Sequence, residues 1–194
     1  MENDMAMQLA ENVTLEGYVS SKGSDLASLK EMYTDYLIEE HERIGELAFG
    51  SPVADYLVTS FIRRDGANAG FVSLDWGRRS VELIYVRPEH RGQGLAKLAL
   101  TELDRICPTT LALKTPLSPG GEALCTELGL GRADNFPDEE AKNEEALRII
   151  GEGIKGTCQH KSKGRRGGDP RKLCKRCYHK ALRRYADAVI AKFA

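Results

Sequence analysis

The chain has 194 residues, of which 41% are hydrophobic, and its 28 Lys and Arg nearly balance its 29 Asp and Glu. This length fits one domain of ordinary size, alone or with a small added module. No apolar run approaches the roughly 18 residues of a membrane span, and residues 1–10 lack the charged-then-apolar pattern of a secretory signal. The composition therefore excludes a membrane protein, and we expect a cytoplasmic one.

The hydrophobic pattern predicts alternating strands and helices up to about residue 136. Residues 1–12 are expected to be a flexible N-terminus. Helices are expected from Asp25, after the glycines at 92 and 94, and from Pro119 to a stop at Gly129. Strands are expected where apolar or β-branched residues alternate between turns, at 13–19, 56–63, 70–76, 80–86 and 109–114. This order predicts an α/β layer with a mixed sheet.

The composition changes beyond residue 136. An acidic helix or linker is expected at 137–156, followed by a basic module at 157–194 that ends in a helix from Leu173 to Phe193. Residues 155–194 carry 13 Lys and Arg and two acids, so their charge is about +11 against about −12 for the rest. Such a split predicts a tail that binds nucleic acid or one that docks on the chain's own acidic part.

A glycine-rich junction follows the strand predicted at 80–86. Val86-Arg87-Pro88 ends that strand, and Arg91-Gly92-Gln93-Gly94-Leu95-Ala96 leads into the next helix. The glycines let the backbone approach a ligand closely, and the first turn of the helix offers unpaired N–H groups to an anion such as a pyrophosphate. The spacing matches neither a P-loop nor the Rossmann fingerprint. A tight connection without a ligand is the alternative.

At these residues the chain resembles the GNAT N-acetyltransferase family. That family has an Arg/Gln-x-x-Gly-x-Gly/Ala signature after a strand that ends in Val-x-Pro. The segment Ala123-Leu124-Cys125-Thr126-Glu127-Leu128-Gly129-Leu130 is also similar to the family's Ala-Leu-Tyr-Glu-x-Leu-Gly-Phe. The resemblance implies an acetyltransferase domain over 13–136, with a mostly antiparallel central sheet flanked by helices. Acetyl-CoA would lie where the middle strands splay apart.

The resemblance also implies which residues hold this cosubstrate. The backbone of Ile84, Tyr85 and Val86 would bind the pantetheine arm, and Ser118 falls where the family often has a cofactor-contacting Asn. The pyrophosphate would lie against the loop and first helical turn, formed by Arg91, Gly92, Gln93, Gly94, Leu95, Ala96 and Lys97.

Acetyl transfer to an amine with a pKa near ~10.4 needs a proton acceptor, a donor to the oxyanion and an acid for the thiolate. Glu82 is the candidate base, near the place where related enzymes keep a Glu; the alternative is an exposed strand residue paired with Lys or Arg. The Val86 N–H is the candidate oxyanion donor. The family's usual acid is Tyr, but Cys125 stands at its position. Cys125 could act as the acid or fill the core, and Tyr85 or a water could replace it.

The tail contains two short-spaced pairs of metal ligands. Cys158-Gln159-His160 and Cys174-Lys175-Arg176-Cys177 suit a tetrahedral structural Zn²⁺ held by Cys158, His160, Cys174 and Cys177, with His179 as a spare. The arrangement resembles small zinc knuckles of some nucleic-acid-associated and phage proteins. Reduced, unligated thiols are the alternative.

These observations predict an acetyl-CoA-dependent N-acetyltransferase whose primary-amine acceptor is nucleic acid, or associated with nucleic acid, and is recruited by the basic tail. Two alternatives remain. One is a nucleic-acid-binding regulator on an inactive GNAT scaffold. The other is a small-molecule amine acetyltransferase whose tail stabilises the fold or a homodimer.

Overall fold

The computed structural model describes residues 6–44, 50–134, 148 and 174–192, which fall into two compact units. The first contains the described residues up to Met32 and those from Gly50 to Asp134. The second contains the rest of α1 (Gly23–Ile44) from Tyr33 onward and the C-terminal helix. Among these residues, no helix combines the length and hydropathy that crossing a membrane requires.

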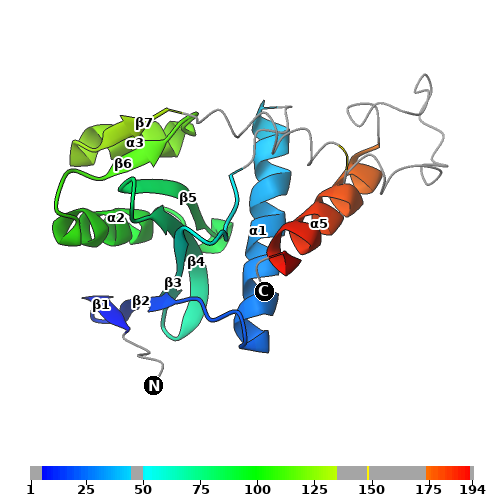
Figure 1. The fold of residues 1–194 in the computed structure, drawn as a ribbon, viewed down its shortest axis with the longest axis horizontal. Coiled ribbons are helices and arrows are strands. Elements are labelled where there is room, and N and C mark those ends of the chain that lie inside the picture. The colour runs from blue at the N-terminus through cyan, green and yellow to red at the C-terminus, as the bar shows by residue number, and fades with distance from the viewer. Residues whose placement is uncertain (1–5, 45–49, 135–147, 149–173, 193–194) are drawn as a thin grey trace. The chain divides into compact units, whose positions relative to one another are not determined.

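A seven-stranded sheet organises the first unit, and its strands lie side by side in chain order (Figure 1). The pairs from β1 to β5 are antiparallel, whereas β5–β6 and β6–β7 are parallel. This arrangement confirms the expected mixed, mostly antiparallel sheet. The strands are β1 (Met7–Ala10), β2 (Val13–Gly17), β3 (Leu57–Arg64), β4 (Ala67–Asp75), β5 (Ser80–Val86), β6 (Ala112–Lys114) and β7 (Gly131–Ala133).

Two strands were not expected from the sequence. β7 has only three residues and pairs in parallel with β6. The flexible N-terminus expected at 1–12 is wrong for Met7–Ala10, which form β1 and pair with β2. Met7 and Leu9 also pack partly against the core, so tertiary burial orders a segment whose own pattern is too short to signal a strand.

Two helices of the first unit have the expected bounds. α2 (Leu95–Ile106) begins after η1 (Pro88–His90) and the glycine loop. α3 (Pro119–Leu128) begins with Pro in its first turn and ends at Gly129, which has a φ of 64° in the left-handed region. Local signals at both ends therefore suffice to define these helices.

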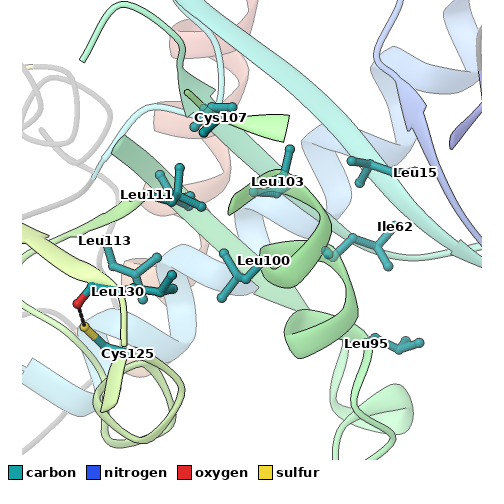
Figure 2. Close-up of a cluster of buried hydrophobic side chains, with 14 of the residues drawn as sticks. Leu15, Ile62, Leu95, Leu100, Leu103, Cys107, Leu111, Leu113, Cys125 and Leu130 are labelled. Atoms are coloured by element: carbon teal, nitrogen blue, oxygen red, sulfur yellow. Dashed lines mark hydrogen bonds between the residues drawn. The ribbon is translucent and has the colours of Figure 1, made fainter. Parts of the chain in front are cut away.

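The core of this unit lies between α2, α3 and one face of the sheet (Figure 2). α2 turns one apolar stripe toward it, formed by Leu95, Ala99, Leu100 and Leu103. Each fully buried leucine of this kind stabilises the fold by about 1.5–3 kcal/mol. Cys107 and Cys125 belong to the same cluster, as expected for core-filling thiols.

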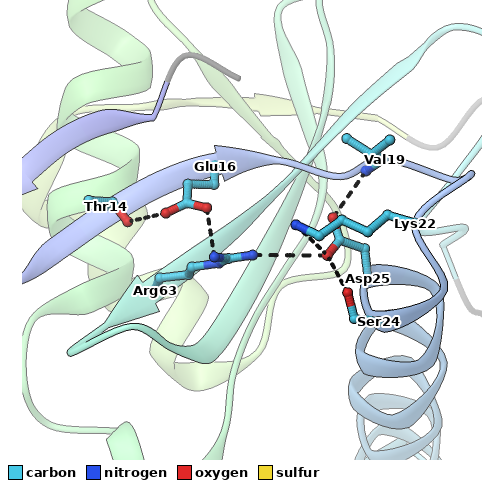
Figure 3. Close-up of polar contacts among 7 residues, drawn as sticks. All are labelled: Thr14, Glu16, Val19, Lys22, Ser24, Asp25 and Arg63. Carbon is cyan, nitrogen blue, oxygen red and sulfur yellow. Dashed lines mark hydrogen bonds and ion pairs between the residues drawn. The ribbon is translucent and has the colours of Figure 1, made fainter. Parts of the chain in front are cut away.

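The first turn of α1 is tied to the sheet by a buried carboxylate, Asp25, which is 2% exposed (Figure 3). It accepts a hydrogen bond of 3.4 Å from the Val19 N–H and lies 3.9 Å from the Arg63 guanidinium. Arg63 in turn pairs with Glu16 on β2 at 2.8 Å. The helix dipole also stabilises an acid in the first turn. Asp25 therefore fixes the start of α1 relative to β2.

The second unit contains Tyr33–Ile44 of α1 and α5 (Lys175–Ala191). Its described part includes the helix expected at 173–193, whereas the linker expected at 137–156 lies outside the described residues except for Arg148. Glu42 of α1 accepts contacts from Lys175 at 2.6 Å and His179 at 3.4 Å. The His41 and Tyr178 rings stack with centroids 3.6 Å apart. The start of the basic tail helix is thus docked on an acidic residue of the same chain.

Candidate active site

The sheet forks between β5 and β6. These strands are paired at two positions, the second of which joins Val81 to Leu113. On its other side β5 stays paired with β4 as far as Val86. From Glu82 onward, one edge of β5 therefore has no strand beside it among the described residues. This is the splay that the family resemblance implied.

A β-bulge explains the fork. Ser73 of β4 pairs with Leu83 and Leu74 pairs with Val81, which leaves Glu82 as an extra residue of β5 without a β4 partner. A bulge bends its strand and increases the local twist. β5 therefore turns away from β6 at the residue where their pairing ends.

The open edge of β5 presents backbone groups to the fork. The Arg87 N–H donates to the Ala69 carbonyl oxygen at 2.9 Å, so this pair faces β4. Because hydrogen-bonding directions alternate along an antiparallel pair, the N–H and C=O of Val86 and Ile84 point away from β4. The Arg91 Nε already donates to the Val86 oxygen at 2.8 Å, which shows that this edge is accessible to a donor.

The glycine loop continues from the end of this edge. Gly92 and Gly94 have φ values of 72° and 75°, which glycine adopts without strain. Gly94 is the N-cap of α2, and it provides no side-chain cap for the helix. The N–H groups of the first turn, Leu95 to Lys97, therefore begin the helix without intrahelical acceptors. The residues from Arg91 to Gly94 are exposed, so the loop can reach a solvent-borne anion.

An ion pair occupies the base of the fork. Glu82 Oε1 and Lys114 Nζ are 2.6 Å apart, and their side chains are 8% and 9% exposed. The sequence alternative for Glu82 was an exposed residue paired with Lys or Arg. The pairing with a Lys is confirmed, but the expected exposure is wrong. Lys114 itself was missed as a site residue. The signal was present, because Leu111 and Leu113 alternate toward the core and place Lys114 on the opposite face of β6.

The segment that enters β3 covers the sheet beside this ion pair. The carbonyl oxygen of Pro52 accepts hydrogen bonds from Thr59 and from Ser73, the latter at 2.7 Å. A Cβ added at Gly50 would lie 3.2 Å from Glu82 Oε1. Residues 50–53, which we call the strap, are thus anchored on two buried hydroxyls and reach the fork at a glycine.

Residues 26–116, which include most of α1, the fork and the glycine loop, match the model of the acetyltransferase (GNAT) family. These residues are therefore similar to GNAT acetyltransferases. The match supports an acyltransferase, and the matched family uses acetyl-CoA and an amine acceptor.

No curated protein matches the sequence. Among solved structures, the chain is similar to an acetyl transferase from Salmonella typhimurium that modifies the N-terminal serine of the 50S ribosomal subunit protein L7/L12. The two chains are 12% identical, with a TM-score of 0.43, and the match covers 64% of this chain and 83% of the other.

The fold brings some of the expected site residues together. Glu82 and the residues from Ile84 to Val86 share β5, and the Tyr85 side chain is buried with the Arg91 guanidinium 5.4 Å from its ring centroid. Ser118 is the N-cap of α3, where its hydroxyl accepts from the Gly121 N–H at 3.1 Å. That hydroxyl keeps its own proton to donate.

Cys125 lies in the core. It is 1% exposed, and its Sγ donates to the Leu130 carbonyl oxygen at 3.3 Å (Figure 2). This environment favours the packing interpretation of Cys125 over a role as acid.

The expected zinc ligands are divided between described and undescribed residues. Cys174 is the N-cap of α5 and Cys177 lies in its first turn, both half-buried. Cys158 and His160 lie outside the described residues. Within the described ranges, no three His, Cys, Asp or Glu side chains are grouped as metal ligands.

Proposed function

We propose that the GNAT domain transfers the acetyl group of acetyl-CoA to a primary amine at the fork between β5 and β6. The observation that carries this proposal is the open edge of β5, which runs from Glu82 to the glycine loop. Ile84 offers its N–H and C=O groups to the amide-rich pantetheine arm. Val86, whose oxygen accepts from Arg91, offers its N–H, and Tyr85 lies between them. Ser118 can donate its hydroxyl proton to the same ligand.

The glycine loop is the proposed pyrophosphate site. Gly92 and Gly94 have no side chain to block the backbone, so a ligand can approach it. The N–H groups of the first turn of α2, together with the helix dipole, attract an anion. Arg91 and Lys97 add positive charge. Lys97 Nζ lies 2.6 Å from Glu127 Oε1, and the Lys97 side chain is about half exposed. The full proposed set is Arg91, Gly92, Gln93, Gly94, Leu95, Ala96 and Lys97.

Acetyl transfer requires a different role from each of several groups at the fork. Glu82 accepts the proton of the acceptor's ammonium, so that a neutral amine attacks the acetyl carbonyl. The Val86 N–H points toward the fork and stabilises the oxyanion that forms. Tyr85 or a water protonates the departing thiolate, because Cys125 is held in the core.

Calorimetry with acetyl-CoA tests the cosubstrate site. Gly94→Glu is expected to abolish binding, because it places bulk and negative charge at the pyrophosphate position. Gly66→Glu is the matched control, since Gly66 has a φ of 78° against 75° for Gly94 but lies in the β3–β4 turn. If wild type fails to bind millimolar acetyl-CoA, or if both variants bind equally well, the proposed site is wrong.

The acceptor is proposed to be nucleic acid or a molecule associated with it. Arg176, Lys180 and Arg183 are exposed on α5 and recur at helical spacing, so they can contact phosphates on one face. We also propose that Zn²⁺ bound by Cys158, His160, Cys174 and Cys177 orders the start of this tail. Metal analysis of the purified chain tests whether it contains Zn²⁺.

A screen with labelled acetyl-CoA against RNA, DNA, aminoacyl-tRNA and cell protein identifies the acceptor class. Gel shifts across a salt series test the role of the tail, with Lys180→Glu and Arg183→Glu expected to weaken binding and reduce its salt dependence. Arg105→Glu, on the exposed face of α2, is the control.

A second candidate is a small-molecule amine acetyltransferase whose tail acts only within the protein or in a homodimer. The contacts of Lys175 and His179 with Glu42 favour it, because they use part of the basic helix for docking. No gel shift at low salt, together with turnover of a small amine, would select this candidate.

A further inference from the structure

The ion pair at the base of the fork is more than a local contact between two strands. Val81 and Leu113 form the last β5–β6 pair, and Glu82 and Lys114 are the next residues of the two strands. Glu82 is also the bulged residue of β5. The fold therefore places a carboxylate and an ammonium side by side where the sheet opens.

Burial makes this pair different from the surface pairs of the same domain. Arg132 of β7 and Glu122 are also 2.6 Å apart, but their side chains are 51% and 48% exposed. Solvent screens exposed pairs of this kind, so they contribute little to stability. Glu82 and Lys114 are each less than a tenth exposed, so solvent screens the attraction between these two ions much less.

The surroundings confine the carboxylate without adding charge. Gly50 of the strap leaves room for Glu82 Oε1, and a Cβ there would also lie 3.1 Å from Leu83 Cγ. The bulge is flanked on β4 by the uncharged Ser73 and Leu74. Among the described residues, Lys114 is the charged side chain in contact with Glu82.

We propose that Lys114 is a positioning residue, which holds the Glu82 carboxylate ionised and in place at the fork so that it can accept the acceptor's proton. This inference rests on the proposed role of Glu82 as the base. In the step that it serves, an N–H bond of the acceptor's ammonium breaks and an O–H bond forms on Glu82. The amine then forms a C–N bond with the acetyl carbon, and the C–S bond breaks to release the CoA thiolate. The second proton that nitrogen loses as the amide forms passes to this thiolate through Tyr85 or a water. Lys114 keeps its proton throughout.

Nuclear magnetic resonance of the protein labelled with ¹³C at the Glu side-chain carboxyl tests this without any acceptor. The Glu82 signal is assigned as the one that disappears in Glu82→Gln. In Lys114→Met the signal is expected to change from ionised to protonated at a pH about one unit or more higher than in wild type, because the buried carboxylate has lost its counter-ion. Lys114→Arg is expected to restore the wild-type titration.

Two further variants keep the test interpretable. Arg132→Met breaks the exposed pair on the neighbouring strand and should leave the Glu82 titration unchanged. Lys114→Gln serves if Lys114→Met does not fold, since it removes the charge but keeps a polar side chain. A Glu82 titration that is the same in wild type and in a folded, uncharged Lys114 variant overturns the inference.

Kinetics with whichever amine in the acceptor screen turns over fastest then connect the pair to catalysis. The acid limb of the pH profile of kcat/KM should move to higher pH in Lys114→Met by the same interval. In a Glu82→Gln background the Lys114 substitution should cause no further shift, because its effect passes through Glu82. A loss of melting temperature without a shift of the limb would indicate a purely structural pair and overturn the inference. If wild type binds and transfers no acetyl group, the proposed function fails, and the carboxyl titration still reports on the pair.

Discussion

Gly70 of β4 pairs with Val86 at the end of the open strand, and its substitution tests whether β4 supports the site. A Cβ at this position would overlap the Tyr85 carbonyl oxygen and lie 3.1 Å from Val86 Cα. Both atoms belong to the backbone of β5, so a side-chain rotation cannot relieve the contact. Gly70→Ala must therefore displace the segment that carries the proposed pantetheine contacts.

The expected cost follows from overpacking, which destabilises a protein by about 1–3 kcal/mol. For a chain of this size each kcal/mol lowers Tm by about 2–4 °C, so Gly70→Ala should lower Tm by about 2–12 °C. Acetyl-CoA affinity should also fall about tenfold or more, because a displaced Val86 misaligns several contacts. Gly17→Ala is the control, since Gly17 lies in strand β2 with open space around its Cα.

Thermal denaturation followed by circular dichroism and calorimetry with acetyl-CoA measure the two effects. Gly17→Ala should match wild type in both. The reasoning is refuted if Gly70→Ala is as stable as Gly17→Ala, or if it loses stability while binding acetyl-CoA with wild-type affinity.

Three further outcomes are expected. Cys125→Ser should lower stability by about 1 kcal/mol without a change in the pH profile of transfer, because the residue packs in the core and donates to Leu130. Loss of the alkaline or acid limb of that profile would instead indicate that Cys125 is the general acid. Leu100→Ala, at a fully buried position of α2, should cost about 2–5 kcal/mol in urea denaturation, and a cost below 1 kcal/mol would contradict the core assignment. Burial lowers the pKa of His41 below its usual 6.5, so the unfolded chain binds the proton more readily. The α1–α5 contact should therefore weaken as pH falls below about 6.5, whereas His41→Phe, which keeps the stack on Tyr178, should remove this dependence; hydrogen exchange of α5 measures it.

The glycine loop and the helices beside it could be predicted from the sequence because their signals are local. The apolar spacing of α2, the Pro and Gly that bound α3, and the turn glycines before Leu95 act within a few residues of where they stand. The strand from Ser80 to Val86 was predicted with its observed bounds for the same reason. The short strands β1 and β7 were missed because three or four residues carry too little pattern, and pairing with a neighbour decides their structure.

The sequence by itself determined where a cofactor's phosphates can be held, through the glycines and the start of α2. It also offered Glu82 as a base, but it could not show what lies against that carboxylate. Only the tertiary structure decided this, because a bulge depends on the register between β4 and β5, and the contact with Lys114 depends on a parallel pairing across 32 residues of chain. Long-range pairing sets both, and no local spacing encodes it.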